Sequence, residues 1–559
     1  MEKRTLRSNL EPGTALWAGR RAQWRALGIS DEDMKKPKIA VINTSSELAS
    51  CFTHLDGIAA LAKQAIRAAG GLPFEVRTAA PSDFITSVGR GGAYILPSRD
   101  LIANDIEVQV EGARLDGMLC LASCDKTTPG QMMAAGRLNI PTIVAICGYQ
   151  QSGFYKGEHV DIEEVFFRSS GVPLGKITIE ELGAMADQAV RSPGVCAGMG
   201  TANSMHILCE ALGMALPGSA PVLANSPKMK EYIQQCGERI VQMVWDDVKP
   251  RDIITKESVA NATMVTLALS GSINCVKHLQ ATATEAGLDV DVYGLFADYA
   301  DKIPLLAAVR PNGEELIEEL EDAGGARAVM KRLERFMYKS ARNVSGQTVG
   351  DILGNAPIKN DGIIRSVDAP LSTRPTINIV RGSLLPGGGI SRLGGTGERR
   401  LQMKGKANIF HSRDEALQAI KDGKVKPGDV VVLRGLGVIG GPGMAMTSAV
   451  VFAIENAGLI DQVGVITEGQ LSGLVNRGLV VGEASPEAAA GGPIAFVENG
   501  DEIEIDIAKK RVDLHVPETV LEERRKKHTV FGAQNERGYL SVYQRTVQPV
   551  HKGAVLSRE

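Results

Sequence analysis

Three cysteines lie in separate loops of the first half of the chain, and each stands beside small or polar residues. They are Cys51, Cys124 and Cys196. Thiolate sulfur is a soft ligand that suits iron, so three such loops that meet could hold an iron–sulfur cluster. The chain has no Cys-x-x-Cys pair, which excludes a zinc ribbon or a ferredoxin-type motif. By spacing alone, an ordinary structural role for each cysteine stays open.

The loop at Cys124 carries a second kind of ligand. A thiol, a carboxyl and an amine follow one another in Cys124, Asp125 and Lys126, and a Thr-Thr-Pro-Gly turn comes next. Carboxylate oxygen suits Mg²⁺, whereas thiolate suits iron, so a turn here could bring two unlike metals close together. The simpler alternative is an ion pair between Asp125 and Lys126 on the surface.

The elements that must position these loops are predicted from apolar runs. Residues 38–43, 118–122 and 142–146 are short apolar segments typical of buried strands, and residues 55–69 are expected to form a helix that ends at Gly70. Strands that alternate with helices indicate a largely parallel sheet covered on both faces. Ligands gather at the carboxyl ends of such strands, which is where the cysteine loops would lie.

The second half of the chain has a different pattern. A segment rich in Pro, Gly and Ser covers residues 355–391, and we place a domain boundary near 375. Beyond it the sequence predicts a helix that starts at the capping box of residues 412–415. It also predicts strands at residues 429–433 and 463–467, and a hairpin formed by residues 502–507 and 511–516. The predicted fold is therefore an α/β domain over residues 1–375 and a β-rich domain over residues 376–559.

Composition limits the class of protein. A chain of 559 residues is long enough for two or more domains. The net charge of −3 gives no electrostatic reason to expect nucleic acid or an anionic membrane as a partner. No apolar run is long enough to span a bilayer and no secretory signal is recognised at the start, so a cytoplasmic protein is expected. In that reducing compartment the remaining cysteines are predicted to pack in the core; they are Cys120, Cys147, Cys209, Cys236 and Cys275.

The heptapeptide Cys-Asp-Lys-Thr-Thr-Pro-Gly at residues 124–130 resembles the signature of the dihydroxy-acid dehydratase and phosphogluconate dehydratase family. Further similar segments follow in order along both halves of the chain, at residues 96–103, 201–205, 216–220, 270–274, 440–444, 472–473 and 485–488. The resemblance implies an N-terminal α/β domain, a C-terminal β-barrel-like domain, and a homodimer or homotetramer.

The resemblance also implies an iron–sulfur cluster. Cys51, Cys124 and Cys196 match the family's three cluster ligands. Three protein ligands leave one iron with an open position, and such an iron is a Lewis acid toward the C3 hydroxyl of a substrate. Both [2Fe–2S] and [4Fe–4S] clusters are compatible with three cysteines, and [2Fe–2S] is favoured here.

The family's magnesium site and its base carry over by position. Asp83 and Asp125 match Mg²⁺ ligands, and Lys126 matches a lysine that is carbamylated in the family and so becomes an anionic ligand. Ser472 matches the base, which removes the C2 proton as an alkoxide. Because serine is a weak acid, nearby cations and N–H donors must lower its pKa for this role.

Several positions depart from the family pattern. Met446 stands where a Glu usually binds Mg²⁺, and a thioether is a poor ligand for a hard cation. Gln470 stands where an Arg usually precedes the serine by two residues. Glu468 and Glu483 are candidate substitutes for the missing acid. At three further positions, Phe84 replaces a usual Gly, Gly200 replaces a common Tyr, and His54 keeps the family's Cys-x-x-His spacing, which favours an orienting or packing role.

The activity that this pattern favours is that of a hydro-lyase. The substrate would be a 2,3-dihydroxy carboxylic acid and the product a 2-oxo acid, as in branched-chain amino-acid biosynthesis. One alternative is an aldonic (sugar) acid dehydratase, and another is a non-catalytic paralogue that binds a cluster. A phosphorylated substrate is not expected, because no Gly-rich phosphate loop with an adjacent Lys or Arg occurs.

Overall fold

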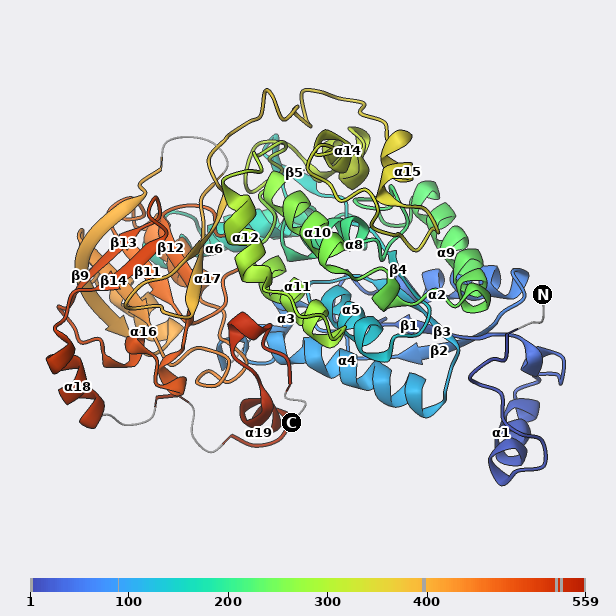
Figure 1. The fold of residues 1–559 in the computed structure, drawn as a ribbon. Coiled ribbons are helices and arrows are strands. Elements are labelled where there is room, and N and C mark those ends of the chain that lie inside the picture. Colours follow the sequence, from blue (N-terminus) through green and yellow to red (C-terminus); the bar gives the residue numbers. More distant parts are fainter. Residues whose placement is uncertain (1–3, 89, 395–398, 528–530, 533–535, 557–559) are drawn as a thin grey trace.

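Two β-sheets of different construction organise the computed structural model, which describes residues 4–88, 90–394, 399–527, 531–532 and 536–556 (Figure 1). One sheet has four strands and comes from the first half of the chain, and the other has eight and comes from the second half. A two-stranded hairpin, β5 (Gly153–Tyr155) with β6 (Glu158–Val160), stands apart from both. These two sheets confirm the predicted fold class.

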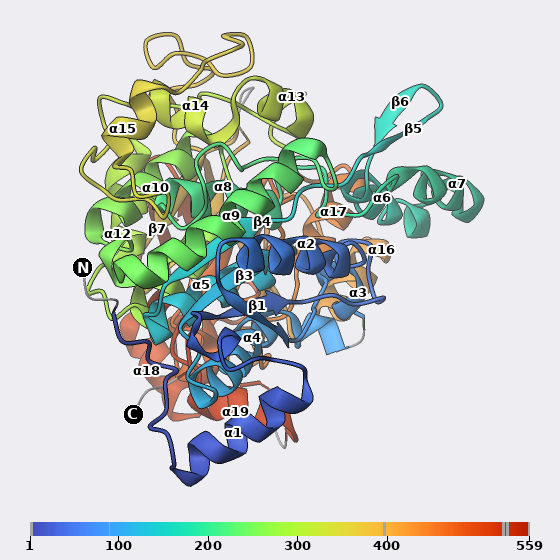
Figure 2. The same ribbon diagram turned by 90° about the vertical axis from the view of Figure 1, so that its right-hand side faces the viewer.

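The first sheet is wholly parallel, with the strand order β2-β1-β3-β4. Its strands are β1 (Lys38–Asn43), β2 (Leu72–Arg77), β3 (Gly117–Ala122) and β4 (Thr142–Ile146). All residues of β1, β3 and β4 are buried, as continuous apolar runs require. Helices α2 (Leu55–Ala68) and α9 (Pro227–Asp246) pack together over one face, while α4 (Ile95–Gly112) and α5 (Thr127–Leu138) lie on the other (Figure 2).

A buried helical layer joins the two halves of the molecule. Its helices are α8 (Thr201–Leu212), α10 (Lys256–Ala268), α11 (Asn274–Glu285) and α12 (Val292–Ala300). Every residue of α8 is buried, so this helix lies at the centre and has no solvent face. Apart from the two helices that cover the barrel, the other described α-helices are α1 (Ala15–Ala26), α3 (Asp83–Thr86), α6 (Ile162–Ser169), α7 (Ile179–Ala189), α13 (Ile317–Asp322), α14 (Gly325–Arg332), α15 (Val349–Gly354), α18 (Glu518–Lys526) and α19 (Tyr539–Thr546).

The second sheet is mixed and curls into a nearly closed barrel. Its order is β14-β13-β9-β10-β11-β12-β8-β7, and a bridge between Arg381, just after β7, and Arg511, in β14, joins the two edge strands. The strands are β7 (Ile377–Val380), β8 (Gly388–Arg392), β9 (Gln402–Phe410), β10 (Asp429–Leu433), β11 (Gly464–Thr467), β12 (Leu479–Ser485), β13 (Glu502–Asp506) and β14 (Arg511–Leu514). The predicted hairpin is thus confirmed as β13 and β14, which pair antiparallel.

Helices α16 (Arg413–Lys421) and α17 (Ser448–Asn456) cover this barrel. Ser412 caps α16 as predicted, because its side chain accepts a hydrogen bond from the backbone N–H of Glu415. The reciprocal bond differs from a capping box, since the Glu415 carboxylate accepts from the N–H of His411 instead. The division of the chain near residue 375 stays a prediction; the first barrel strand begins at Ile377. None of the described helices combines the length and apolar character that a membrane crossing requires.

Candidate active site

A cavity of about 110 Å³ lies between the four-stranded sheet and the barrel. Its wall includes six side chains singled out from the sequence as ligands, base or departure, namely Asp83, Cys124, Asp125, Cys196, Met446 and Ser472. Three helices begin at this wall, because Thr201 opens α8, Ser448 opens α17, and Lys126 caps α5 beside Asp125. Helix N-termini present unpaired N–H groups and partial positive charge, so these parts of the wall favour an anionic group.

The three predicted cluster ligands come together at one end of the cavity. Cys51 follows β1 and Cys124 follows β3, and their thiols lie within hydrogen-bonding distance of each other. The chain before Cys196 reaches the same edge, because Val195 pairs with Tyr149 just beyond β4. The contact with Cys124 and burial raise the pKa of the Cys51 thiol, and burial followed by Glu163 raises that of Cys196. Three buried thiols that face one another in this way fit a cluster of several irons, which would hold them as thiolates.

The other five cysteines are buried in the core, as predicted. Cys120, for example, is part of β3 and has no exposed surface, although it lies only four residues before Cys124.

Two carboxyl groups and a lysine form the second part of the site. The Lys126 ammonium lies 2.9 Å from one oxygen of Asp83, whose other oxygen is buried without a hydrogen-bond partner. Asp125 contacts Asp83, and burial together with this neighbour raises the pKa of Asp125 to about 7. Burial acts to lower the pKa of Lys126, but the two carboxylates outweigh it and raise that pKa. Two adjacent carboxyl groups, one with a buried oxygen that lacks a partner, fit a hard cation such as Mg²⁺.

Ser472 lies on the opposite wall, in the loop after β11. Its hydroxyl oxygen accepts a hydrogen bond from the N–H of Leu474 at 3.2 Å, and its own N–H donates to the Ser448 hydroxyl at 2.6 Å. The following Gly473 must be small, because a Cβ there would lie 2.9 Å from the Ser272 hydroxyl oxygen. The loop is thus pressed against the N-terminal half of the chain, which places the serine hydroxyl at the cavity.

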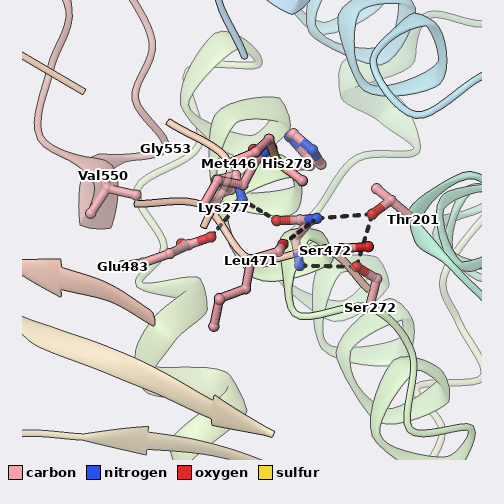
Figure 3. Close-up of polar contacts among 12 residues, drawn as sticks. Thr201, Ser272, Lys277, His278, Met446, Leu471, Ser472, Glu483, Val550 and Gly553 are labelled. Carbon is pink, nitrogen blue, oxygen red and sulfur yellow. Dashed lines mark hydrogen bonds and ion pairs between the residues drawn. The ribbon is translucent and has the colours of Figure 1, made fainter. Parts of the chain in front are cut away.

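A hydrogen-bonded chain behind Ser472 fixes this position (Figure 3). The Asn274 amide donates to the carbonyl of Leu471 and to the hydroxyl of Thr201, which is 2.9 Å from that of Ser272. Lys277 donates to Asn274 and, at 2.5 Å, pairs with Glu483. The sequence offered one signal for this chain, since Asn274 lies in a segment that resembles the family.

Comparison with known proteins agrees with this geometry. The N-terminal domain of the dihydroxy-acid/6-phosphogluconate dehydratases matches residues 36–352, and the C-terminal domain matches residues 362–554. The chain belongs to this family. It is 39% identical to a dihydroxy-acid dehydratase of Ignicoccus hospitalis over 97% of this chain and 98% of the relative. It is also 39% identical to a dihydroxy-acid dehydratase of Methanococcoides burtonii over 96% of this chain and 98% of the relative.

The two main departures from the family pattern contact each other. The Gln470 amide donates a hydrogen bond of 2.8 Å to the Met446 sulfur, and the two residues also pair as a β-bridge. The usual Glu and the usual Arg are therefore replaced together by two neutral side chains, so the net formal charge at this wall is unchanged. Two separate departures in the sequence are one change in the structure.

Neither candidate substitute for the missing acid faces the cavity. The Glu468 carboxylate accepts hydrogen bonds from the N–H groups of Gly435, Leu436 and Ala488, and Glu483 is engaged by Lys277. The Nε2–H of His54 donates a hydrogen bond of 2.8 Å to the carbonyl oxygen of Cys147, because a carbonyl can only accept. This contact agrees with the predicted orienting or packing role of His54.

Arg392, at the end of β8, is a residue of the site that sequence reasoning missed. Its guanidinium donates to the carbonyl oxygens of Gly473 and Ser270. Burial lowers the pKa of Arg392 to about 10, which still leaves it charged at neutral pH. It thus places a cation beside the loop of residues 468–474 that carries Ser472 (the serine loop), where the neutral Gln470 supplies none. No local pattern in the sequence marks it.

We expect Arg392→Met to reduce kcat by a factor on the order of 10². Loss of the cation should raise the pKa of Ser472, so the rise of kcat/KM with pH should move to higher pH. Arg392→Lys, which keeps the charge, should retain a profile closer to wild type. The measurement is kcat/KM from pH 6 to 10, and an unchanged profile in Arg392→Met would show that the charge does not act on the serine.

Proposed function

We propose that the protein is a hydro-lyase that converts a 2,3-dihydroxy carboxylic acid to a 2-oxo acid. The observation that carries the proposal is the single cavity faced by two of the three clustered cysteines, by the Asp83–Asp125 pair and by Ser472. The proposal also has the support of family membership over nearly the whole chain and of relatives named dihydroxy-acid dehydratase.

The wall that would receive the substrate side chain is apolar. Phe84, Phe166 and Leu474 line it, and the rings of Phe84 and Phe166 meet edge to face at 5.5 Å. An aliphatic side chain gains by burial against such a wall, whereas the extra hydroxyls of an aldonic acid would lose their water there. We therefore propose a branched aliphatic substrate and a place in branched-chain amino-acid biosynthesis.

The residues present fit two inorganic cofactors. Cys51, Cys124 and Cys196 would hold an iron–sulfur cluster, for which we propose [2Fe–2S], and Asp83, Asp125 and a carbamylated Lys126 would hold Mg²⁺. When bound, these groups would supply a Lewis acid for the departing hydroxyl and positive charge for the substrate carboxylate.

The chain's own groups would move the proton. Ser472, as an alkoxide, takes the proton from C2, and the N–H of Leu474 and the nearby Arg392 stabilise the negative charge on its oxygen. The C3–O bond breaks, and the hydroxyl leaves as water with the proton that Ser472 removed from C2. The resulting enol loses its O–H proton, gains a proton at C3 and becomes the 2-oxo acid. We further propose that the enzyme is a homodimer or homotetramer of the cytoplasm.

Anaerobic purification followed by iron and sulfide analysis tests the cofactor, and a screen for 2-oxo acid formation tests the reaction. We expect 2,3-dihydroxy-3-methylbutanoate to be turned over with a kcat/KM at least about 100-fold above that of gluconate, because burying a branched alkyl group contributes a few kcal/mol. Preference for gluconate would favour the aldonic acid alternative. Iron without turnover on any hydroxy acid would favour a non-catalytic paralogue.

A further inference from the structure

We propose that Glu163 replaces the acid that is missing at Met446 and faces the Mg²⁺ held by Asp83 and Asp125. This inference rests on the proposed function, because it assumes that the site binds the cation. It assigns the third carboxylate of the site to a helix of the N-terminal half, on a different wall from the usual position.

The first support is the setting of the Glu163 carboxylate. Glu163 is 7% exposed and lines the same cavity as Asp83, Asp125 and Ser472. Among the described residues, none donates a hydrogen bond to it. A buried carboxylate that lacks a donor is unfavourable unless a cation or another ligand satisfies it, so this side chain itself points to a positively charged ligand in the cavity.

The second support is the space that two glycines leave for it. A Cβ at Gly198 would overlap Oε2 of Glu163, and a Cβ at Gly200 would lie 2.8 Å from Oε1. Gly200 stands where a Tyr is common in the family, and no such side chain would fit beside Glu163. The changes at positions 200 and 446 therefore belong together, since one admits an acid to the cavity and the other removes one.

Helix α6 holds Glu163 in this place. The N–H of Glu164 donates to Asp161, which caps the helix, and Phe166 packs edge-on against Phe84 and Phe452 at 5.5 and 5.8 Å between ring centroids. Phe84 belongs to α3 and Phe452 to α17, so α6 is clamped between the two halves of the molecule, as its place beside α17 in Figure 2 indicates. These contacts fix the helix, and with it the backbone of Glu163, beside the cavity.

The mode of binding follows from the ion's chemistry. Within the described ranges, no three His, Cys, Asp or Glu side chains are grouped closely enough to bind one metal ion directly. Mg²⁺ is dehydrated reluctantly and usually keeps several of its waters in proteins. We therefore place Glu163 in contact with a water of the ion, so that it acts as a positioning residue.

Metal binding to the anaerobic holoenzyme tests the inference without relying on activity. The probe is Mn²⁺, whose binding is measured by the loss of the electron paramagnetic resonance signal of the free ion. Competition with Mg²⁺ then gives the affinity for Mg²⁺. We expect Glu163→Gln, which keeps size and shape, to weaken Mn²⁺ binding at least about 10-fold with unchanged iron content. Glu164→Gln is the matched control, because its carboxylate pairs with Arg168 at 2.6 Å, and its affinity should equal that of wild type.

A rescue experiment separates loss of charge from loss of structure. In the Glu163→Gln background, Met446→Glu with Gln470→Arg should restore Mn²⁺ affinity to within about threefold of wild type. Equal affinity in wild type and Glu163→Gln would overturn the inference and leave the proposed function standing. A wild-type holoenzyme that binds no Mn²⁺ or Mg²⁺ would overturn both the inference and the proposed magnesium site.

Discussion

The Ser472→Ala variant is expected to lose about 10³-fold or more in kcat while its iron content and visible spectrum stay those of wild type. The serine loop presents the hydroxyl of Ser472 to the cavity, and the oxygen of this hydroxyl accepts a hydrogen bond from the N–H of Leu474. The variant removes the oxygen of the proposed base and leaves the predicted cluster ligands in place, because these are Cys51, Cys124 and Cys196. Steady-state kinetics and absorption spectra of the anaerobic protein measure the two effects.

Exchange of the C2 hydrogen with solvent gives a sharper measurement of the same step. Wild type in D₂O should wash the C2 hydrogen out of bound substrate if proton removal is reversible, and Ser472→Ala should not. Ser448→Ala is the matched control, since it removes a hydroxyl from the same wall, one that accepts the N–H of Ser472 at 2.6 Å and so orients the loop. We expect the kcat of Ser448→Ala to fall roughly 10-fold, which corresponds to the free energy of one hydrogen bond. Turnover near wild type in Ser472→Ala would show that another group is the base.

The second large effect is expected from a pair of cysteines four residues apart. Cys124→Ala should lose most of its iron and all measurable activity, because it removes one of three ligands that the cluster would need. Cys120→Ala should keep its iron, because the Cys120 thiol lies in β3 and is enclosed by the core. Its only expected cost is a small cavity, which lowers the free energy of unfolding by about 1 kcal/mol.

Iron and sulfide analysis of both variants, with urea unfolding of each, distinguishes binding from folding. Cys51→Ala and Cys196→Ala should behave like Cys124→Ala, since the thiols of Cys51 and Cys124 are in contact and Cys196 lies near them. If Cys124→Ala keeps a full complement of iron, these cysteines are not the cluster ligands. If Cys120→Ala loses its iron instead, the ligand set must be reassigned.

Much of the fold could be predicted because its signals are local. The apolar runs at residues 38–43 and 142–146 coincide with β1 and β4, and the predicted helix of residues 55–69 is α2 with its end at Ala68. A fully buried parallel strand needs such a run, and a helix that stops at Gly70, whose φ is +85°, uses a residue that tolerates this conformation. Each of these features depends on neighbours in sequence, so composition and order are enough to predict it.

The sequence by itself also determined the chemistry of the site, because it fixes which side chains are available. The sequence and its resemblance to the family indicate thiols in three loops, two carboxyls, a lysine and a serine, and the structure brings them to one cavity and its immediate wall. Their roles as ligands and base remain predictions that the variants above test.

Only the tertiary structure decided how the departures from the family are arranged. Met446 and Gln470 are 24 residues apart and touch because β10, β11 and the loops that follow them are neighbours in the barrel. Arg392 reaches the serine loop from a different strand, and Glu163 reaches the cavity because two phenylalanines clamp α6 between the halves of the molecule. Such contacts join segments far apart in the chain, and their geometry is set by packing. A single sequence records the residues but not which of them meet.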